Sequence, residues 1–310
     1  MCSSDNRAEP ALCPLCGSAA ASQLEYPSSA PRPELPLESI RSCAGCGFGE
    51  ALPHPTQTQL DDFYSTGKYW DGSGADPYQV AHENQQSRLR MQRILPWLDR
   101  GRSLRVADIG AGHGCIAYWL GTATGVQIAS YDFIEPDDAN ARAIQSNAAR
   151  FFPVSRKQDT SALSEGSYDL VFMNHVLEHV ADPVAFATHV FGALRVGGIA
   201  YVETPHLDYR FKPDVFPHTL FFTRAAFAAL GARTGVSQLE CRGFGAWPGS
   251  PAGISVLAHR VLARLFRLSV NLGWGTMQQT LDAAIWRYPD NDDGIWLRWI
   301  CRRTAAVLRQ

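Results

Sequence analysis

The sequence has little net charge and no long apolar run. Its 310 residues carry 28 Lys and Arg against 30 Asp and Glu, a formal net charge of −2, so no overall basic field attracts it to nucleic acid. The opening decapeptide, MCSSDNRAEP, lacks the apolar stretch of a secretory signal, and we expect a cytoplasmic protein. The longest uncharged run, Ile109 to Tyr131, contains five glycines and is not typical of a membrane span. No internal repeat is present.

Hydrophobic residues make up 45% of the chain, enough to build a full core for an ordinary globular protein. The charge is uneven along the sequence. Residues 1–50 contain three Arg and six acidic residues, whereas residues 251–310 contain eight Arg and four Asp. A surface that follows phosphates would be basic, so the acidic N-terminal region makes nucleic acid an unlikely partner.

Four of the eight cysteines form two C-x2-C pairs, Cys13 with Cys16 and Cys43 with Cys46, and each pair is followed directly by a glycine. This pattern predicts four thiolates around one tetrahedral Zn²⁺. Two disulfides are the alternative, which a reducing cytosol disfavours. A closed shell of four cysteines leaves no open position for a substrate, so we predict a structural zinc ribbon that compensates for a small hydrophobic core.

Strand and helix patterns alternate after residue 100, and a helical pattern over 78–98 precedes them. The predicted strands cover 104–109, 126–134, 151–155, 168–173 and 198–203. The predicted helices cover 113–122, 137–149, 183–195 and 223–234. Such alternation is typical of an α/β fold with a doubly wound, mostly parallel sheet. The ligand of such a sheet is expected outside the carboxyl ends of its strands.

The stretch VADIGAGHG at 106–114 connects the first of these strands to a helix. Its glycines let the backbone approach a ligand, and the helix start offers free N–H groups. The dinucleotide fingerprint G-x-G-x-x-G would need a third glycine at 115, where this chain has Cys115. Asp108 would face the phosphates of a dinucleotide at an electrostatic cost, but it suits a ligand with an ammonium group, such as S-adenosylmethionine.

Several motifs together resemble the class I S-adenosylmethionine-dependent methyltransferases, which have a Rossmann-like fold. They are D-x-G-x-G-x-G at 108–114, YDFIEPDD, YDLVFMNHVLEHVADP and LRVGGIAYVETP. With the cysteine pairs in front, the chain is similar to a subgroup that has an N-terminal zinc-binding region. That subgroup includes C-methyltransferases of nucleotide-linked deoxysugars.

The resemblance implies a set of cofactor-binding residues. They are Asp108, Gly110, Ala111, Gly112, Gly114, Glu135, Asp159, Asn174 and His175. Glu135 matches the acid that binds both ribose hydroxyls, with Asp132 as a competing candidate. Asp159 matches the position that binds the adenine amino group, although the preceding SRKQ departs from the usual pattern.

The predicted catalytic residues are His218, Glu203 and Tyr69. His218 lies in an H-x-x-x-F-T stretch where the subgroup has a substrate-side histidine, and it is the candidate base. Pro217 stands where the sugar C-methyltransferases often have an acid, which counts against a paired Glu–His mechanism. Packing or capping is the alternative role for His218, and packing is the alternative for Tyr69. Glu203 ends the fifth predicted strand, where it would face the site from the carboxyl edge of the sheet.

We expect four regions: a zinc ribbon (1–55), a linker and lid helix (56–100), the cofactor-binding core (101–250) and a partly helical C-terminal extension (251–310). The extension has basic helical patterns over 254–268 and 294–309. Such helices can lie weakly on a membrane surface. A substrate cap, or a final antiparallel strand at 294–301, is the alternative.

The sequence therefore predicts an enzyme, a methyltransferase of a small molecule. The expected acceptor is a nucleotide-linked sugar or a glycan or lipid precursor. The alternatives are a non-catalytic S-adenosylmethionine-binding zinc-ribbon protein, an O-methyltransferase of a lipid-like acceptor, and a nicotinamide oxidoreductase, against which Cys115 counts.

Overall fold

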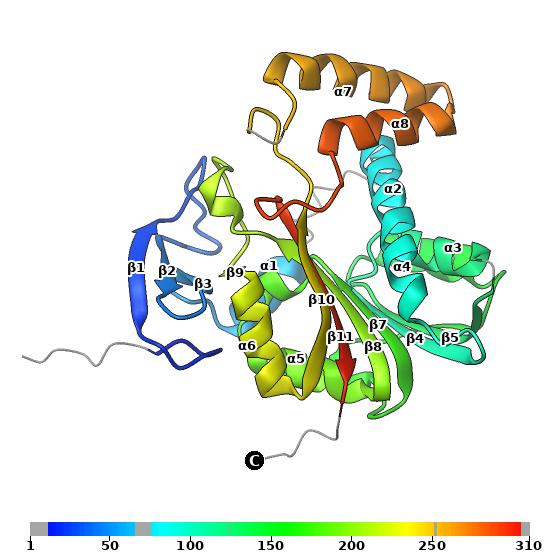
Figure 1. The fold of residues 1–310 in the computed structure, drawn as a ribbon, viewed down its shortest axis with the longest axis horizontal. Coiled ribbons are helices and arrows are strands. Elements are labelled where there is room, and N and C mark those ends of the chain that lie inside the picture. Colours follow the sequence, from blue (N-terminus) through cyan, green and yellow to red (C-terminus); the bar gives the residue numbers. More distant parts are fainter. Residues whose placement is uncertain (1–11, 66–75, 124, 251–252, 305–310) are drawn as a thin grey trace, which may run out of the picture.

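A seven-stranded sheet forms the centre of the computed structural model, which describes residues 12–65, 76–123, 125–250 and 253–304 (Figure 1). Its strands, in the order β10-β11-β8-β7-β4-β5-β6, are β10 (Val236–Phe244), β11 (Trp296–Arg303), β8 (Leu194–Pro205), β7 (Tyr168–Asn174), β4 (Ser103–Ile109), β5 (Gln127–Ile134) and β6 (Val154–Arg156). The five strands from β8 to β6 pair in parallel, whereas β11 is antiparallel to both of its neighbours. The predicted fold class is confirmed.

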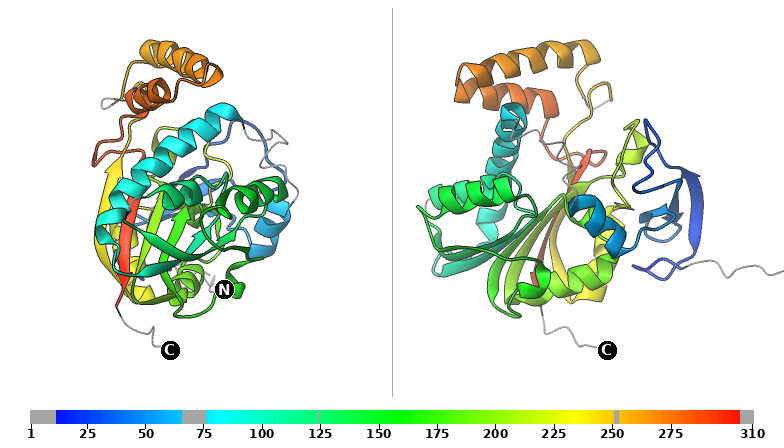
Figure 2. Two further views of the ribbon diagram at one scale, coloured as in Figure 1. Left: turned by 90° about the vertical axis from the view of Figure 1, so that its right-hand side faces the viewer. Right: turned by 180° about the vertical axis from the view of Figure 1, so that it is seen from behind.

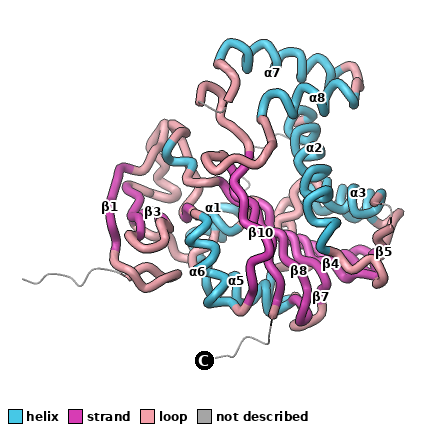
Figure 3. Tube along the Cα trace, viewed as in Figure 1, coloured by secondary structure: helices cyan, strands magenta, loops and turns pink. Residues whose placement is uncertain are grey.

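Helices cover both faces of this sheet (Figure 3). One face packs against α2 (Pro77–Ile94), α3 (Cys115–Thr122) and α4 (Asp138–Ala148), and the other packs against α5 (Pro183–Ala193) and α6 (Arg224–Thr234). Alternate residues of a strand point to opposite faces: Leu170 and Phe172 join the first core, and Val171 and Met173 join the second. Strands buried on both faces read as continuous apolar runs, as β7 does.

Local signals explain where the helices begin and end. Asp182 accepts hydrogen bonds from the backbone N–H groups of Val184 and Ala185, with Pro183 in the first turn of α5. Helix α2 gives way at Ile94 to a short 3₁₀ turn that contains Pro96, because proline cannot continue an α-helix ladder. The strand predicted at 151–155 is shorter and shifted, and it forms only the edge strand β6.

The cysteine-rich region forms a second sheet with four antiparallel strands: β1 (Ala20–Glu25), β2 (Ser39–Cys43), β3 (Gly49–Leu52) and β9 (Leu220–Phe221). Strand β9 comes from the long segment between β8 and α6. The ribbon is therefore joined to the core by backbone pairing. The rings of Phe48 and Phe222, 5.3 Å apart, add a packed contact. Figure 2 shows the ribbon and α3 at opposite sides of the large sheet. Helix α1 (Gln57–Ser65) follows the ribbon.

The C-terminal region contributes to the large sheet as well as forming a helical hairpin. Helices α7 (Val256–Asn271) and α8 (Gly275–Trp286) lie between β10 and β11 in the sequence and contact α2 (Figure 1). Strand β11 then fills the sheet between β8 and β10, so the sheet crosses the boundary expected at residue 250. This agrees with the alternative of a final antiparallel strand. No helix in the described part of the chain is both long and apolar enough to cross a membrane.

Candidate active site

A cavity of about 960 Å³ opens at the carboxyl ends of β4, β5 and β7, where a ligand is expected in this fold. Most of the predicted cofactor residues line it: Asp108, Gly110, Ala111, Gly112, Glu135, Asp159, Asn174 and His175. Gly114, Glu203 and His218 are absent from the lining. Tyr69 lies outside the described residues. The structure thus brings together residues that are up to 67 positions apart in the sequence.

The glycine turn after β4 owes its shape to two residues in the left-handed region. Gly110 has φ 69° and Gly112 has φ 54°, which other residues adopt only with strain. A Cβ on Gly110 would also lie 2.6 Å from Val176 Cγ2. Gly114 has another role: it begins α3, and a Cβ there would meet Ile144 Cγ1 at 2.7 Å. Its contribution is therefore close packing of α3 against α4.

Asp108 is buried beneath this turn, at the end of β4, and its Oδ2 accepts a 2.5 Å hydrogen bond from the Tyr131 hydroxyl. Burial raises the pKa of Asp108 to about 7, although the Tyr131 hydrogen bond acts in the opposite direction. The carboxyl group lines the cavity and is poorly solvated. A cationic ligand would supply the charge partner that the protein alone does not.

Glu135 follows β5, and its two carboxylate oxygens are held by different backbone groups. Oε2 accepts from the Gly112 N–H at 2.8 Å and Oε1 accepts from the Asp137 N–H at 2.9 Å. Burial raises its pKa to about 7. The competing candidate, Asp132, accepts instead from the Tyr168 hydroxyl at 2.6 Å and does not line the cavity. Of the two candidates, Glu135 lines the cavity and Asp132 does not.

The charge of the cavity wall decides which kind of ligand fits. Among the described residues, the lining contains one arginine, Arg90, and no lysine, against six acidic residues, Asp61, Glu83, Asp108, Glu135, Asp159 and Asp182. A dinucleotide would bring its pyrophosphate into this acidic surrounding. The acidic wall of the cavity instead favours an adenosine ligand that carries a sulfonium and an ammonium group.

Comparison with known proteins agrees with this ligand. A family model described as a methyltransferase domain matches residues 78–267. The chain belongs to this methyltransferase family. Ubiquinone biosynthesis O-methyltransferases from Xanthomonas campestris pv. campestris (strain B100) and Xanthomonas oryzae pv. oryzae (strain PXO99A) are each 28% identical to it over 152 residues, which is 48% of this chain and 61% of theirs.

A solved structure shows the same fold. A candidate sarcosine dimethylglycine methyltransferase from Galdieria sulphuraria superposes with a TM-score of 0.50 at 16% identity, covering 80% of this chain and 98% of the other. The chain spans about 61% of the length of the curated relatives that it matches. S-adenosylmethionine is the cofactor that the family implies, and the eight predicted residues that line the cavity fit it.

The structure also places Asn174 and Asp159 on this cavity. Asn174 ends β7, and its Oδ1 is buried without a hydrogen-bond partner among the described residues. A ligand that donates a hydrogen bond would satisfy this atom. Asp159 is at the mouth, where its Oδ1 accepts from the N–H and the hydroxyl of Ser161.

Glu203 lies under the cavity in a buried ion pair. Arg90 of α2 donates to both of its oxygens, and the Tyr201 hydroxyl donates to Oε2 at 3.0 Å. Burial opposes ionisation of Glu203, but the Arg90 charge and the hydrogen bond from His175 outweigh it and hold its pKa well below its usual range. An ionised, fully engaged carboxylate is a poor base. These contacts do not support the predicted catalytic role.

Replacing Arg90 by methionine is expected to lower the free energy of unfolding by about 3–5 kcal/mol, because it leaves the Glu203 charge buried without its partner. Arg93, one turn along α2, makes an exposed 3.4 Å pair with Asp290. Arg93→Met is therefore the matched control, with a change of about 1 kcal/mol or less. Urea titration of both variants measures the difference, and equal losses would contradict the account.

His175 carries a positive charge on the cavity wall. Burial disfavours that charge, but contacts of its Nδ1 with Glu178 (3.2 Å) and its Nε2 with Glu203 (3.4 Å) raise its pKa to about 9. Its backbone lies in the left-handed region, with a φ of 54°. The site thus offers an imidazolium as well as carboxylates, which suits a zwitterionic amino-acid end.

His218 lies behind the cavity wall and forms a dyad with a buried carboxylate. Its Nδ1 is 2.9 Å from Asp208 Oδ2, which also accepts from Lys212 Nζ at 3.0 Å. His179 lines the cavity, and its ring packs against that of His218 with 5.0 Å between the centroids. His179 Nδ1 is 2.7 Å from the Tyr64 hydroxyl of α1.

Sequence reasoning missed the part of the wall that α2 supplies. Glu83 contacts the His113 ring and borders Gly112, while Gln86 and Arg90 continue the same face one and two turns later. Polar residues at 83, 86 and 90 in an otherwise buried helix face follow helical spacing. That pattern was the available signal for a functional surface.

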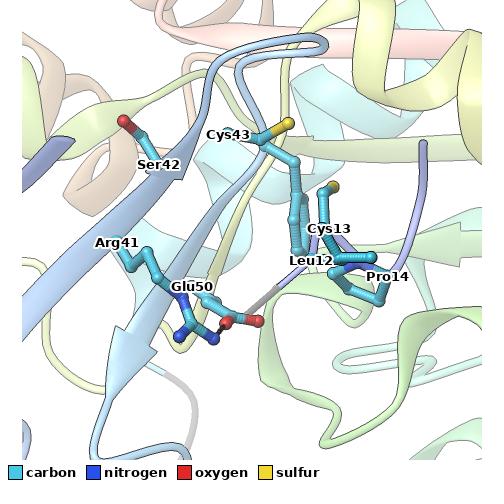
Figure 4. Close-up of a pocket in the computed structure, with 8 residues that line it drawn as sticks. Leu12, Cys13, Pro14, Arg41, Ser42, Cys43 and Glu50 are labelled. Carbon is cyan, nitrogen blue, oxygen red and sulfur yellow. Dashed lines mark hydrogen bonds and ion pairs between the residues drawn. The ribbon is translucent and has the colours of Figure 1, made fainter. Parts of the chain in front are cut away.

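The four cysteines of the ribbon converge on one point. Their Sγ atoms lie within 4.8 Å of one another, with 3.7 Å between Cys13 and Cys46 and 3.4 Å between Cys16 and Cys43. Four thiolates at about 2.3 Å from one Zn²⁺ would be separated by similar distances. Figure 4 shows Cys13 and Cys43 beside a small pocket that the ion pair of Arg41 and Glu50 borders.

Acidification is expected to weaken cofactor binding. Asp108 and Glu135 both have a pKa of about 7 in the folded protein without ligand, above the usual values near 4. The folded state therefore binds more protons than the unfolded state between about pH 4 and 7, and these two groups contribute less stability as the pH rises through that window. A cationic ligand requires ionised Asp108.

We therefore expect the dissociation constant of S-adenosylmethionine to rise between pH 7.5 and 5.5, by about tenfold per pH unit for each carboxyl that must ionise. Calorimetric titrations in buffers of different ionisation enthalpy also count the protons released on binding. Affinity that is constant over this range would contradict the pKa assignment.

Proposed function

We propose that this protein transfers a methyl group from S-adenosylmethionine to a small-molecule acceptor. The observation that carries the proposal is the acidic cavity at the end of a Rossmann-type sheet, with a glycine turn and two carboxyls of raised pKa. S-adenosylmethionine supplies an electrophilic methyl on a sulfonium centre. The protein has to bind and orient the two reactants, because positioning contributes much of the rate of such a displacement.

Each part of the cofactor has a candidate partner. Glu135 would accept from the two ribose hydroxyls, because its carboxylate is fixed by two backbone N–H groups. Asp159 would bind the adenine amino group. Asp108 and the unpaired Asn174 Oδ1 would receive the ammonium group, and the His175 imidazolium would face the carboxylate. The negative and the positive groups of the cavity wall would thus bind the ammonium and the carboxylate of the cofactor, respectively.

For the acceptor, we propose a sugar or a glycan or lipid precursor, as the sequence resemblance implies. The acceptor side of the cavity contains Tyr64, His179 and Phe186. The single arginine of the described lining is already paired with Glu203. The diphosphate of a nucleotide-linked sugar would therefore be expected to stay outside the cavity while the sugar enters.

One observation favours a lipid-like acceptor as a second candidate. Helix α7 exposes five large apolar side chains, Val256, Leu257, Val261, Leu265 and Leu268, of which Leu257 is 73% exposed, and the exposed Leu272 follows directly after the helix. Arg260 and Arg264 lie among them. A basic amphipathic helix of this kind suits weak contact with an anionic membrane surface, and an acceptor held there could reach a cavity at the same end of the sheet.

We infer that Cys13, Cys16, Cys43 and Cys46 hold one structural Zn²⁺. The distances between their Sγ atoms support this, and so do the left-handed glycines Gly17 and Gly47 that turn the chain after each pair. Four protein ligands would leave no position open for a substrate. The ion would fix the loop ends of the ribbon sheet.

A label-partition assay tests the proposed function. Purified protein is incubated with methyl-labelled S-adenosylmethionine and a cell extract, and the product is separated into aqueous and organic phases. Label in the aqueous phase supports a nucleotide-linked sugar, and label in the organic phase supports a lipid-like acceptor. Asp108→Ala is the control protein, and only label that is transferred by the wild type and lost in this variant is attributed to the enzyme. Cofactor binding without any transfer, over extracts from several growth conditions, would contradict the enzyme proposal and favour a non-catalytic binding protein.

A further inference from the structure

Four histidines belong to the described lining of the cavity: His82, His175, His179 and His189. His175 has a glutamate at each ring nitrogen, and its pKa of about 9 makes it a cation. His179 pairs with a tyrosine hydroxyl of α1, and Nε2 of His189 pairs with a backbone carbonyl oxygen at 2.7 Å. His82 differs from the other three, because a single buried aspartate holds one of its ring nitrogens.

The partner of His82 comes from the C-terminal hairpin. His82 Nδ1 lies 2.6 Å from Oδ1 of Asp282 in α8, a residue 200 positions further along the chain. Asp282 is 1% exposed, and its Oδ2 accepts a 2.5 Å hydrogen bond from the Tyr288 hydroxyl. A neutral imidazole meets an ionised carboxylate through its N–H group. In that form, the ring of His82 therefore carries its proton on Nδ1.

The other ring nitrogen of His82 is left for a ligand. The hydrogen bonds of this ring among the described residues are made by Nδ1, and the side chain is 22% exposed. The rings of Trp286 and Trp296 lie 5.1 and 6.4 Å from it and restrict its orientation. His82 thus has a fixed ring, a carboxylate on one side and an unused lone pair on Nε2.

Helix α2 brings His82 to the wall beside the glycine turn. Gln79, His82, Glu83 and Gln86 repeat at helical spacing, and all four line the cavity. Oε1 of Glu83 would lie 3.2 Å from a Cβ added to Gly112. His82 is therefore close to the turn where the amino-acid end of the cofactor is proposed to bind. In S-adenosylmethionine the sulfonium joins this end to the ribose, so the reacting group of an acceptor is expected in this part of the cavity.

We propose that His82 is the general base for a hydroxyl group of the acceptor, and that Asp282 positions it. The acceptor would then be a hydroxyl compound and the product a methyl ether. A carboxylate behind an imidazole fixes its tautomer and stabilises the imidazolium that forms. This proposal rests on the proposed function. It gives His82 the role predicted for His218, which packs instead against His179 of the wall.

The proposed step conserves atoms and charge. The acceptor oxygen forms a bond to the methyl carbon, and the bond between that carbon and sulfur breaks with its electron pair on sulfur. The hydroxyl proton moves to Nε2 of His82. The positive charge of the sulfonium is thereby replaced by that of an imidazolium next to the buried Asp282, and release of the proton to water restores the base.

NMR spectra of protein labelled with ¹⁵N-histidine test the pair of His82 and Asp282 without any acceptor. The ring signals of His82 are those that disappear in His82→Gln. In the wild type we expect the proton on Nδ1 and none on Nε2. In Asp282→Asn the proton should move toward Nε2, because the asparagine amide can donate to Nδ1. A proton on Nε2 of the wild type, under the mildly alkaline conditions of the transfer assay, would overturn the proposal.

Transfer of label from methyl-labelled S-adenosylmethionine to a cell extract tests the catalytic role. His82→Gln keeps a donor for Asp282 but has no basic nitrogen, so the rate of transfer should fall by about 100-fold or more. In Asp282→Asn it should fall by at least about tenfold. Calorimetry should show the affinity for S-adenosylhomocysteine within about twofold of the wild type in both variants.

His259→Ala is the matched control, because the His259 ring contacts the same Trp286 at 6.2 Å but is not part of the described lining. It should transfer label as the wild type does. Full transfer by His82→Gln, or a loss of cofactor affinity as large as its loss of transfer, would overturn the role of His82 as base. Absence of transfer by the wild type would overturn the proposed function and this role with it, whereas the NMR spectra would still show whether Asp282 orients the ring.

Discussion

Asp108→Asn is expected to weaken S-adenosylmethionine binding by about 100-fold, equivalent to about 3 kcal/mol. The substitution keeps the size of the side chain and its place beside Tyr131, but it removes the negative charge that Asp108 can carry beneath the glycine turn. Hydrogen bonds between charged partners contribute about 1.5–3 kcal/mol, and an ammonium left without its partner adds a desolvation cost. Isothermal titration calorimetry measures the change.

Asp132→Asn is the matched control for this experiment. Asp132 is also a buried carboxylate near the end of a central strand, but it contacts Tyr168 and Lys157 and does not line the cavity. Its replacement should leave the dissociation constant within about twofold. A similar loss of affinity in both variants would show that Asp108 acts through stability and not through the ligand.

Cys43→Ser is expected to abolish the proposed zinc binding of the ribbon and to reduce the proposed methyl transfer by at least about tenfold, while cofactor affinity stays nearly unchanged. The ribbon holds the segment that carries His218: the Tyr26 hydroxyl donates to the His218 carbonyl at 2.9 Å, and the Ala51 N–H donates to the Thr219 carbonyl at 2.8 Å. Loss of a structural zinc removes binding energy on the order of 10 kcal/mol from the local fold.

Elemental analysis for zinc, hydrogen exchange over residues 12–54 and steady-state kinetics check this prediction together. Cys241→Ser is the control, because Cys241 is a partly buried thiol of β10 outside the ribbon. Full activity in a zinc-free Cys43→Ser protein would contradict a positioning role for the ribbon. A parallel loss of cofactor affinity would show that the damage extends to the sheet.

Much of the cavity lining could be predicted from the sequence because its signals are local. The glycine turn and the acid before it occur within nine residues, and the residues after β5 and β7 lie where parallel strands bring their ends together. Glu135 could be separated from Asp132 only in three dimensions, because both lie near the end of the same strand. Their hydrogen-bond partners come from other elements.

The acceptor half could not be predicted in the same way, because distant elements assemble it. Glu203 follows the expected pattern at the end of β8, yet Arg90 from α2, 113 residues away, converts it into half of an ion pair. His218 and His179 meet because the ribbon sheet takes β9 as its fourth strand. Neither contact can be predicted from a local periodic pattern in the sequence, because its two residues are far apart along the chain.

The C-terminal region could not be assigned to a helix or a strand from its sequence alone. Arginine and tryptophan over 294–303 fit a basic surface helix as well as a strand. In the structure, Trp299 is fully buried between α5 and α6 at ring distances of 5.6 and 4.9 Å from Phe191 and Phe227, and the Arg298 guanidinium pairs with Glu240 and Asp290. The sequence alone does not distinguish an arginine that is paired on a buried strand from one that is solvated on a surface helix, because the acidic partners come from other elements.

A crystal structure of the protein with S-adenosylhomocysteine tests the assignment of the cavity as the cofactor site. In that complex we expect the ribose hydroxyls on Glu135, the adenine beside Asp159 and the amino-acid end at the turn of Gly110 to Gly112, near Asn174. Density for the nucleoside in another cavity, or in this one with the adenine on the Asn174 side, would contradict it.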